Sequence, residues 1–279
     1  MMNPPKENIC ASVITYNPNV KRLYENLAAV LPQVAKVYIC DNGSSNIAVI
    51  RHLCSSIGLH VELEELGENK GIAYALNKCF EKAVSGGYAW NITLDQDSVC
   101  EPELVSNLAI HAKSDVAIVS PSIIYRNNEG YAARGMNGVD EVKWVITSAS
   151  LTNVRAWQAV HGFDEWMFID GVDIDFCIRT AKAGYKIVRV NDTWLMHELG
   201  NLKCLKVLGR VIYVTNHNPK RKYYMARNSI YLYNKLGFGH PTITIMKLLF
   251  KSILFESRKC ESVMCIANGM KDARGFSSL

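Results

Sequence analysis

Short apolar segments alternate with helical patterns through the first hundred residues of the chain, and this alternation restricts the fold more than any other feature. The expected strands are 9–15, 36–40, 60–64 and a run ending at residue 94, and the expected helices are 20–31, 47–56 and 71–84. Repeated strand–helix units favour a mostly parallel sheet with helices on both faces, which is a Rossmann-like α/β fold. Ligands of such folds bind beyond the carboxyl ends of the strands.

Polar residues follow these strands at the predicted binding edge. The first strand runs into Thr15, Tyr16 and Asn17, the second into Asp41, and the fourth into Asp95 and Asp97. Two carboxylates one residue apart suit Mg²⁺ or Mn²⁺ held against a diphosphate. Asp, Asn and Ser also occur in turns for purely local reasons, so a structural role is the alternative for each of them.

A further segment of this edge, around Asn69 and Gly71, leads into the third predicted helix. Backbone N–H groups at such a helix start can bind a phosphate. The first strand is not followed by a GxGxxG sequence, which argues against a dinucleotide-binding Rossmann domain.

Composition favours a globular protein of the reducing cytoplasm. The chain has 279 residues, of which 49% are hydrophobic, enough for a sizeable core. Its nine cysteines stand in apolar segments without zinc spacing, and an odd number fits poorly with a disulfide framework. The N-terminal residues lack the apolar stretch of a signal peptide, so we expect a cytoplasmic protein.

We expect a catalytic domain at residues 1–215 and a helical region at 216–279. The first 98 residues contain the alternating strand–helix units, and residues 99–215 differ in character, with strands at 116–120 and 142–147. Three acidic residues, Asp170, Asp173 and Asp175, lie near the start of a predicted helix. Asp170, Asp173 and Cys177 are expected to share one helix face. These acids either favour the helix dipole or include a catalytic base.

The last third of the chain is basic and predicts three helices, at 221–234, 242–255 and 261–274. Lys247 and Lys251 interrupt the most apolar of them, so no segment reaches the roughly 20 apolar residues that span a bilayer. Peripheral membrane contact is one expectation, and packing as core or as a subunit interface of a homo-oligomer is the other.

Several short motifs, in this order and spacing, resemble those of family 2 glycosyltransferases, in particular the bacterial rhamnosyltransferase branch. The motifs are Val13–Asn17, Asp41–Ser44, Asn69–Asn77, Leu94–Ser98, Phe168–Arg179 and Arg221–Asn228. The resemblance implies an A-type glycosyltransferase fold and sugar transfer with inversion from a nucleotide-sugar. It also implies that residues 1–98 are the nucleotide-sugar-binding half of the catalytic domain and that 99–215 are the acceptor half.

Carried over residue by residue, the resemblance assigns roles to the polar residues at the strand ends. The residues around the nucleobase and ribose would be Thr15, Tyr16, Asn17, Asp41 and Asp95. Asp97 would bind the metal, with His197 as an additional ligand, since imidazole also suits Mn²⁺. Asp173 would be the base although Val172 replaces the glutamate that often precedes it, and Asp170 would orient the acceptor.

The resemblance further implies dTDP-L-rhamnose as donor and a lipid-linked saccharide of cell-surface polysaccharide synthesis as acceptor, reached at the cytoplasmic face of the inner membrane. Another nucleotide-sugar is the first alternative. A nucleotidyltransferase would require a basic, glycine-rich segment after the first strand, where 15–18 have neither glycine nor lysine. A non-catalytic membrane-binding or nucleic-acid-binding protein ranks last, and we expect no nucleic-acid partner.

Overall fold

The computed structural model describes residues 4–126, 137–198, 203–207, 210–214 and 217–273, with only the backbone described in 203–214. The chain forms two compact units. The N-terminal unit comprises Met1–Trp166 and Phe176–Glu198, and the C-terminal unit comprises Met167–Asp175 and Leu199–Leu279. The domain boundary expected after residue 215 stays a prediction. The Asn-, Gly- and Arg-rich segment between strands 116–120 and 142–147 lies partly outside the described residues.

One mixed sheet forms the centre of the N-terminal unit. Its strands are β1 (Ile9–Thr15), β2 (Lys36–Asp41), β3 (Val61–Glu65), β4 (Trp90–Asp95), β5 (Val99–Cys100), β6 (Val116–Tyr125), β7 (Val139–Glu141), β8 (Ser150–Asn153) and β9 (Lys186–His197). The order is β3-β2-β1-β4-β8-β6-β9-β5, with β7 beside β9. Strands β1 to β4 pair in parallel, whereas β8 runs antiparallel to both β4 and β6.

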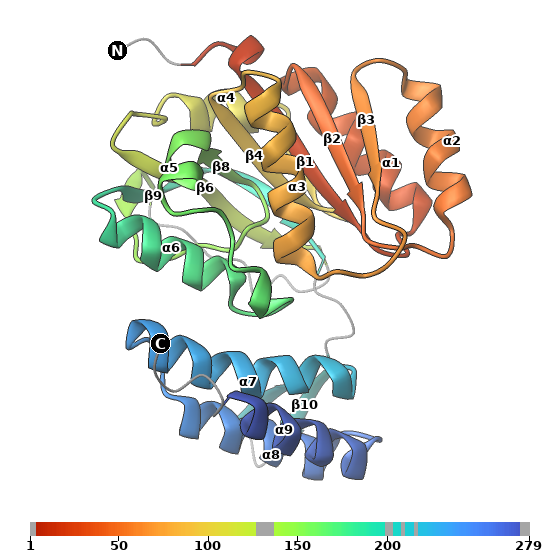
Figure 1. Cartoon of the computed structure of the whole chain (residues 1–279), viewed down its shortest axis with the longest axis vertical. Coiled ribbons are helices and arrows are strands. Elements are labelled where there is room, and N and C mark those ends of the chain that lie inside the picture. Colours follow the sequence, from red (N-terminus) through yellow and green to blue (C-terminus); the bar gives the residue numbers. More distant parts are fainter. Residues whose placement is uncertain (1–3, 127–136, 199–202, 208–209, 215–216, 274–279) are drawn as a thin grey trace. The chain divides into compact units, whose positions relative to one another are not determined.

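Both faces of the central strands are buried, which explains why β1 reads as a continuous apolar run rather than an alternating one. Helix α3 (Ile72–Ser85) contacts β1, β2 and β4 and also packs against α5 (Val154–Ala159). Helices α1 (Val20–Val30) and α4 (Leu104–Ala109) contribute to a separate hydrophobic cluster together with α2 (Ile47–Ile57). Figure 1 shows α3 and α1 on opposite sides of the sheet.

The predicted strand at 142–147 is wrong. The chain pairs instead at β7 and β8, and the residues between them have no regular strand. Ser148 and Ala149 follow, and Ala149 adopts a φ of 58° immediately before β8. A turn at this position allows the chain to enter the sheet antiparallel to β4, which hydrophobic patterning does not reveal.

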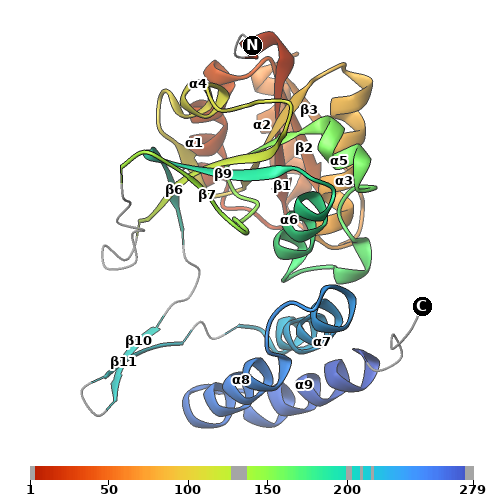
Figure 2. The same ribbon diagram turned by 90° about the vertical axis from the view of Figure 1, so that its left-hand side faces the viewer.

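The C-terminal unit contains three helices, each close to its predicted place, and a hairpin. The helices are α7 (Pro219–Leu236), α8 (Pro241–Phe255) and α9 (Lys259–Ala273), and the hairpin strands are β10 (Lys203–Val207) and β11 (Arg210–Val214). Figure 2 shows α7 and α9 side by side, and Gly269 permits this approach because a Cβ there would clash with the carbonyl of Tyr223. The small core between the helices includes Ala226, Ile245 and Ile266.

Candidate functional site

Asp41 organises the loop that follows β2. Its buried carboxylate accepts hydrogen bonds from the Thr15 hydroxyl (2.8 Å) and from the N–H groups of Gly43 (3.1 Å) and Ser44 (2.8 Å). Gly43 has a φ of 81°, and a Cβ there would lie 2.6 Å from Cα of Glu68. The carboxyl ends of β1 and β2 are therefore fixed to one another through this carboxylate.

Asn17 and Tyr16 extend this network at the end of β1. Asn17 has a φ of 49°, its N–H donates to the Ser44 hydroxyl (2.8 Å), and its side-chain oxygen accepts from the Ser45 N–H (2.8 Å). The Tyr16 N–H donates to the side-chain oxygen of Gln96 (2.8 Å), while half of the tyrosine remains exposed. The backbone of this loop is held and its aromatic ring faces solvent, an arrangement suited to stacking on a planar base.

Asn69 and Gly71 lie where the chain enters α3. The Lys70 N–H donates to the Asn42 side chain (2.8 Å), and the Gly71 N–H donates to Asn69 Oδ1 (3.0 Å). Gly71 adopts a φ of 90°, which disfavours any residue with a side chain. The structure thus brings this segment beside the β2 loop, and the phosphate contacts of Asn69 and Gly71 stay predictions.

Asp97 follows β4 and contains a buried carboxylate oxygen, Oδ1, that has no hydrogen-bond partner. Burial raises the pKa of Asp97, and the neighbouring Asp95 raises it further, whereas His197 lowers it. His197 Nδ1 lies 3.8 Å from Asp95 Oδ2. The structure therefore gathers Asp95, Asp97 and His197 at the end of β4, although His197 is a hundred residues away in the sequence.

Two serines and an asparagine fix this group, and the sequence analysis missed all three. The Ser98 hydroxyl lies 3.0 Å from His197 Nδ1 and 2.9 Å from the Ser148 hydroxyl. The Asn26 side chain donates to the backbone oxygens of Asp95 (3.0 Å) and Ser98 (2.7 Å). These bonds hold the β4 loop from two other elements of the fold.

Asn26 could have been found in the sequence. It occupies a core position of α1, on the helix face that buries Leu23, Leu27 and Val30. A polar residue on the buried face of an amphipathic helix must find hydrogen-bond partners. Its presence therefore predicts a hydrogen bond from the helix to a neighbouring segment such as a loop. Ser98 and Ser148 give no comparable signal, because serines are common in turns.

A divalent metal fits the Asp97 site in part. No three His, Cys, Asp or Glu side chains within the described part of the chain form a group that would hold a metal by themselves. Mg²⁺ is commonly bound by one or two carboxylates together with substrate phosphates, so a complete set of protein ligands is not required. The buried Asp97 oxygen without a hydrogen-bond partner is the observation that favours a metal here, since a buried polar atom without a partner is costly.

In the C-terminal unit, Asp170 lies outside the helix that follows it, which corrects one expectation. Helix α6 (Val172–Lys182) begins two residues later, and Asp170 has a φ of 65°, so it shares no helix face with Asp173 and Cys177. Its carboxylate accepts two hydrogen bonds from Arg221, one from Nε (2.9 Å) and one from Nη2 (2.8 Å). This bidentate pair compensates the charge of Asp170.

The other two acids of this segment differ in environment. Asp175 is fully buried and pairs with Lys235 at 2.8 Å. Asp173 is partly exposed in the first turn of α6, where its Oδ1 accepts from the Ile174 N–H (2.9 Å). A helix N-terminus favours the ionised carboxylate. Asp173 therefore differs from Asp175 in its exposure and from Asp170 in its place inside the helix, and its role as base stays a prediction.

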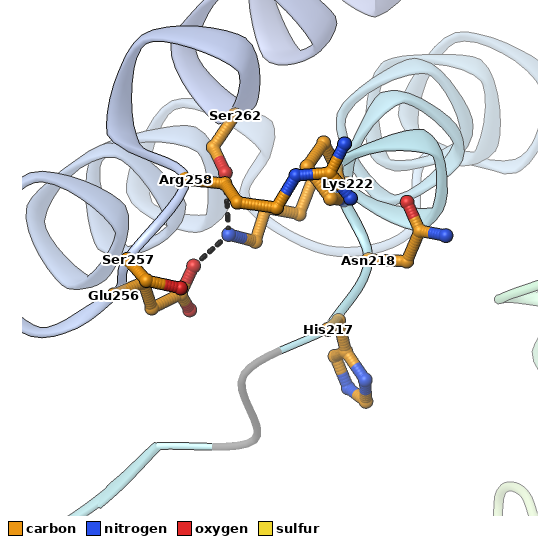
Figure 3. A pocket seen from close by; sticks show the side chains of 8 residues that line it. His217, Asn218, Lys222, Glu256, Ser257, Arg258 and Ser262 are labelled. Carbon is orange, nitrogen blue, oxygen red and sulfur yellow. Dashed lines mark hydrogen bonds and ion pairs between the residues drawn. The ribbon is translucent and has the colours of Figure 1, made fainter.

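A cavity of about 300 Å³ lies within the C-terminal unit, between the start of α7 and the connection from α8 to α9 (Figure 3). Lys222 is buried beside it and is held by Glu256 and by the Ser262 hydroxyl (2.9 Å). His217 also lines it, and burial together with Arg221 lowers the pKa of His217 to about 4. The cations nearest the cavity are thus neutralised or paired, as expected of a structural feature.

Comparison with known proteins identifies the family. Residues 10–179 match the model of the family described as glycosyl transferase family 2. The chain is 29% identical over 244 residues to "dTDP-rhamnosyl transferase RfbF" of Shigella flexneri, covering 82% of this chain and 80% of the relative.

Solved structures share the fold at low sequence identity. S. aureus TarS 1-349 in complex with UDP-GlcNAc has a TM-score of 0.63 at 15% identity, covering 95% of this chain and 80% of that one. The mannosyltransferase PcManGT from Pyrobaculum calidifontis, in complex with GDP-Man and Mn²⁺, has a TM-score of 0.60 at 15% identity, with 99% and 77% covered. The predicted A-type glycosyltransferase fold with a C-terminal helical extension is confirmed, and the chain belongs to glycosyl transferase family 2.

Proposed function

We propose that this glycosyltransferase transfers L-rhamnose from dTDP-L-rhamnose, with inversion, to a lipid-linked saccharide acceptor. The dTDP-rhamnosyl transferase relative supports the donor. The observation that carries the proposed chemistry is the buried, unpartnered Asp97 oxygen beside Asp95 and His197. A carboxylate oxygen of this kind at the end of a parallel strand would hold a divalent metal, and the metal would bind the diphosphate of a nucleotide-sugar.

The donor would bind along the carboxyl ends of β1, β2 and β4. The exposed Tyr16 ring would stack on the base, and Asn17 and Asp41 would hold the loops around it. Asp95 would accept a hydrogen bond from the ribose. Because most of these loop atoms are already held by hydrogen bonds, the loops would lose little conformational entropy on binding.

Asp97, with His197 as an additional ligand, would hold Mg²⁺ or Mn²⁺ against the diphosphate. A divalent ion bound there stabilises negative charge on the leaving diphosphate. The chain's own contribution is to keep the Asp97 carboxylate buried and the His197 ring oriented by Ser98. A protonated acid is then not needed on the leaving group.

Asp173 would act as the general base. It would take the proton from an acceptor hydroxyl while that oxygen forms a bond to the anomeric carbon, and the bond from this carbon to the diphosphate oxygen would break. Attack on the face opposite the leaving group inverts the configuration. Asp170 would orient the acceptor indirectly, since its carboxylate pairs with Arg221.

One face of α8 exposes several apolar side chains, which supports an acceptor located in a membrane. Its apolar side chains are 48–64% exposed at positions that share one helix face: Ile243, Met246, Phe250, Ile253 and Leu254. Lys247 and Lys251 flank this stripe, and basic residues beside an exposed apolar face are typical of interfacial helices. No helix in the described residues is long and apolar enough to cross a membrane. Salt-sensitive binding to anionic vesicles, weakened by Lys247→Glu with Lys251→Glu, would support this contact, and absence of binding at low salt would contradict it.

Release of dTDP from dTDP-L-rhamnose, measured with and without Mn²⁺, tests the donor assignment. UDP-GlcNAc and GDP-Man serve as comparison donors, because the solved structures of similar fold contain them. The proposal predicts Mn²⁺-dependent turnover and thermal stabilisation with dTDP-L-rhamnose above the other two. A clear preference for another nucleotide-sugar would replace the donor while leaving the reaction class unchanged.

A further inference from the structure

The segment before α6 has an unusual backbone. Phe168 and Asp170 adopt φ angles of 61° and 65°, and Gly171 has a φ of 90°. Positive φ is unfavourable for residues with a side chain and for a bulky aromatic residue in particular. Such a conformation persists only where its surroundings impose it, and it often marks a functional site.

Asn228 of α7 imposes this conformation most directly. Its buried side-chain nitrogen lies 2.8 Å from the carbonyl oxygen of Met167, 2.7 Å from that of Ile169 and 2.8 Å from that of Asp170. Arg227 Nε donates to the Asn228 side-chain oxygen (3.0 Å), which fixes the orientation of the amide. One amide group therefore contacts three carbonyl groups within four residues of an otherwise unfavourable backbone.

The remaining contacts come from the same face of α7. Besides Asn228, this face presents Arg221, Tyr224, Leu232 and Lys235, at the three- and four-residue spacing of one helix face. Arg221 pairs with Asp170, Tyr224 stacks on Phe168 with ring centroids 4.6 Å apart, and Lys235 pairs with Asp175. A Cβ on Gly171 would lie 2.9 Å from Leu232 Cδ1.

We propose that Asn228 and Arg221 are positioning residues that set the start of α6 and hence the location of the Asp173 carboxylate. The inference rests on the proposed role of Asp173 as base. Under this inference, α7 contributes to catalysis because it determines where the base lies. The helix itself does not contact the reacting atoms. Displacement of a catalytic group by about 1 Å can cost about a hundredfold in rate.

Asn228→Ala is the principal test, and Asn234→Ala is the matched control because Asn234 is an exposed asparagine of the same helix. We expect Asn228→Ala to lower kcat about 10- to 100-fold with the donor Kd within twofold of wild type, and Asn234→Ala to change neither. A folded Asn228→Ala protein with kcat within twofold of wild type would overturn the inference. So would a loss of kcat matched by an equal loss of donor affinity.

Hydrogen exchange gives a readout that does not depend on activity. Asn228→Ala should speed amide exchange in residues 167–175 at least tenfold and leave α3 unchanged, while unchanged exchange in 167–175 would overturn the inference. Should Asn228→Ala fail to fold, Arg221→Ala replaces it, with exposed Lys220→Ala as control, and the same outcomes apply.

Asp173→Asn separates this inference from the proposed function. Full activity of Asp173→Asn together with a slow Asn228→Ala would refute Asp173 as the base. The positioning role of α7 would then apply to the segment 167–175 but not to a base at Asp173. A slow Asp173→Asn with a fully active Asn228→Ala would support Asp173 as the base and refute the positioning role of α7.

Discussion

The proposed donor edge, meaning the loops at the ends of β1 and β2, and the segment 167–175 hold their acidic residues in different ways. At the donor edge, Asp41 and Asn17 bind backbone and side-chain groups of neighbouring loops, all close to the strand ends that carry them. The segment 167–175 is held instead by α7, from residues about fifty to sixty positions later in the chain. The ends of β1 and β2 are organised by their own loops, and the segment 167–175 depends on a separate helix.

This difference separates what determines donor binding from what determines the position of the proposed base. Under the proposed function, the hydrogen-bonded loops after β1 and β2 would keep the nucleotide site formed whether or not an acceptor is present. A segment held by another element would change with that element, so the geometry on the proposed acceptor side would vary while the proposed donor site stays constant. Substitutions in the two regions should accordingly affect binding and turnover separately.

Asp41→Ala should have the largest effect on the donor side. It leaves the Thr15 hydroxyl and two loop N–H groups without their buried acceptor, so we expect the free energy of unfolding to fall by about 3 kcal/mol. Donor affinity should fall at least tenfold, measured by calorimetry. Asp115→Ala, at an exposed ion pair with Lys186, is the control and should change neither. Wild-type affinity in a folded Asp41→Ala protein would show that the loops do not depend on this carboxylate.

Lowering the pH should have a smaller effect, on the stability of the C-terminal unit. Burial and Arg221 lower the pKa of His217 from 6.5 to about 4, so the unfolded chain binds more protons between these values. Stability from this group is therefore present above pH 6.5 and lost as pH falls towards 4, by at most about 3 kcal/mol. His217→Gln should reduce the acid sensitivity of unfolding in this window. An unchanged pH dependence would mean that His217 is accessible to protons in the folded state.

The same contrast explains what the sequence could predict. Strand and helix patterning located β1, α3 and the three C-terminal helices closely, because their apolar residues follow regular periods. Thr15 and Asp41 end β1 and β2, and Asp97 follows the end of β4, so the strand pattern alone placed all three at this edge of the sheet. Their roles stay predictions. Asn26 was overlooked although its place on an apolar helix face gave a signal.

The remaining features depend on tertiary structure. No local pattern predicts that Phe168 and Asp170 take positive φ angles, since these angles are held by contacts with Asn228 and its neighbours on α7. The shared helix face expected for Asp170 and Asp173 failed for this reason. The antiparallel entry of β8 likewise depends on the turn at Ala149 rather than on periodicity.

Calorimetry of donor binding to Asp97→Asn and Asp173→Asn, with and without Mn²⁺, tests the central claim most directly. The account predicts that Asp97→Asn loses Mn²⁺-dependent affinity for dTDP-L-rhamnose, since the amide is a poor replacement for a carboxylate ligand. Asp173→Asn should bind the donor like wild type while turning over about 10² to 10⁴ times more slowly. Unchanged Mn²⁺-dependent binding by Asp97→Asn, or near wild-type turnover by Asp173→Asn, would contradict it.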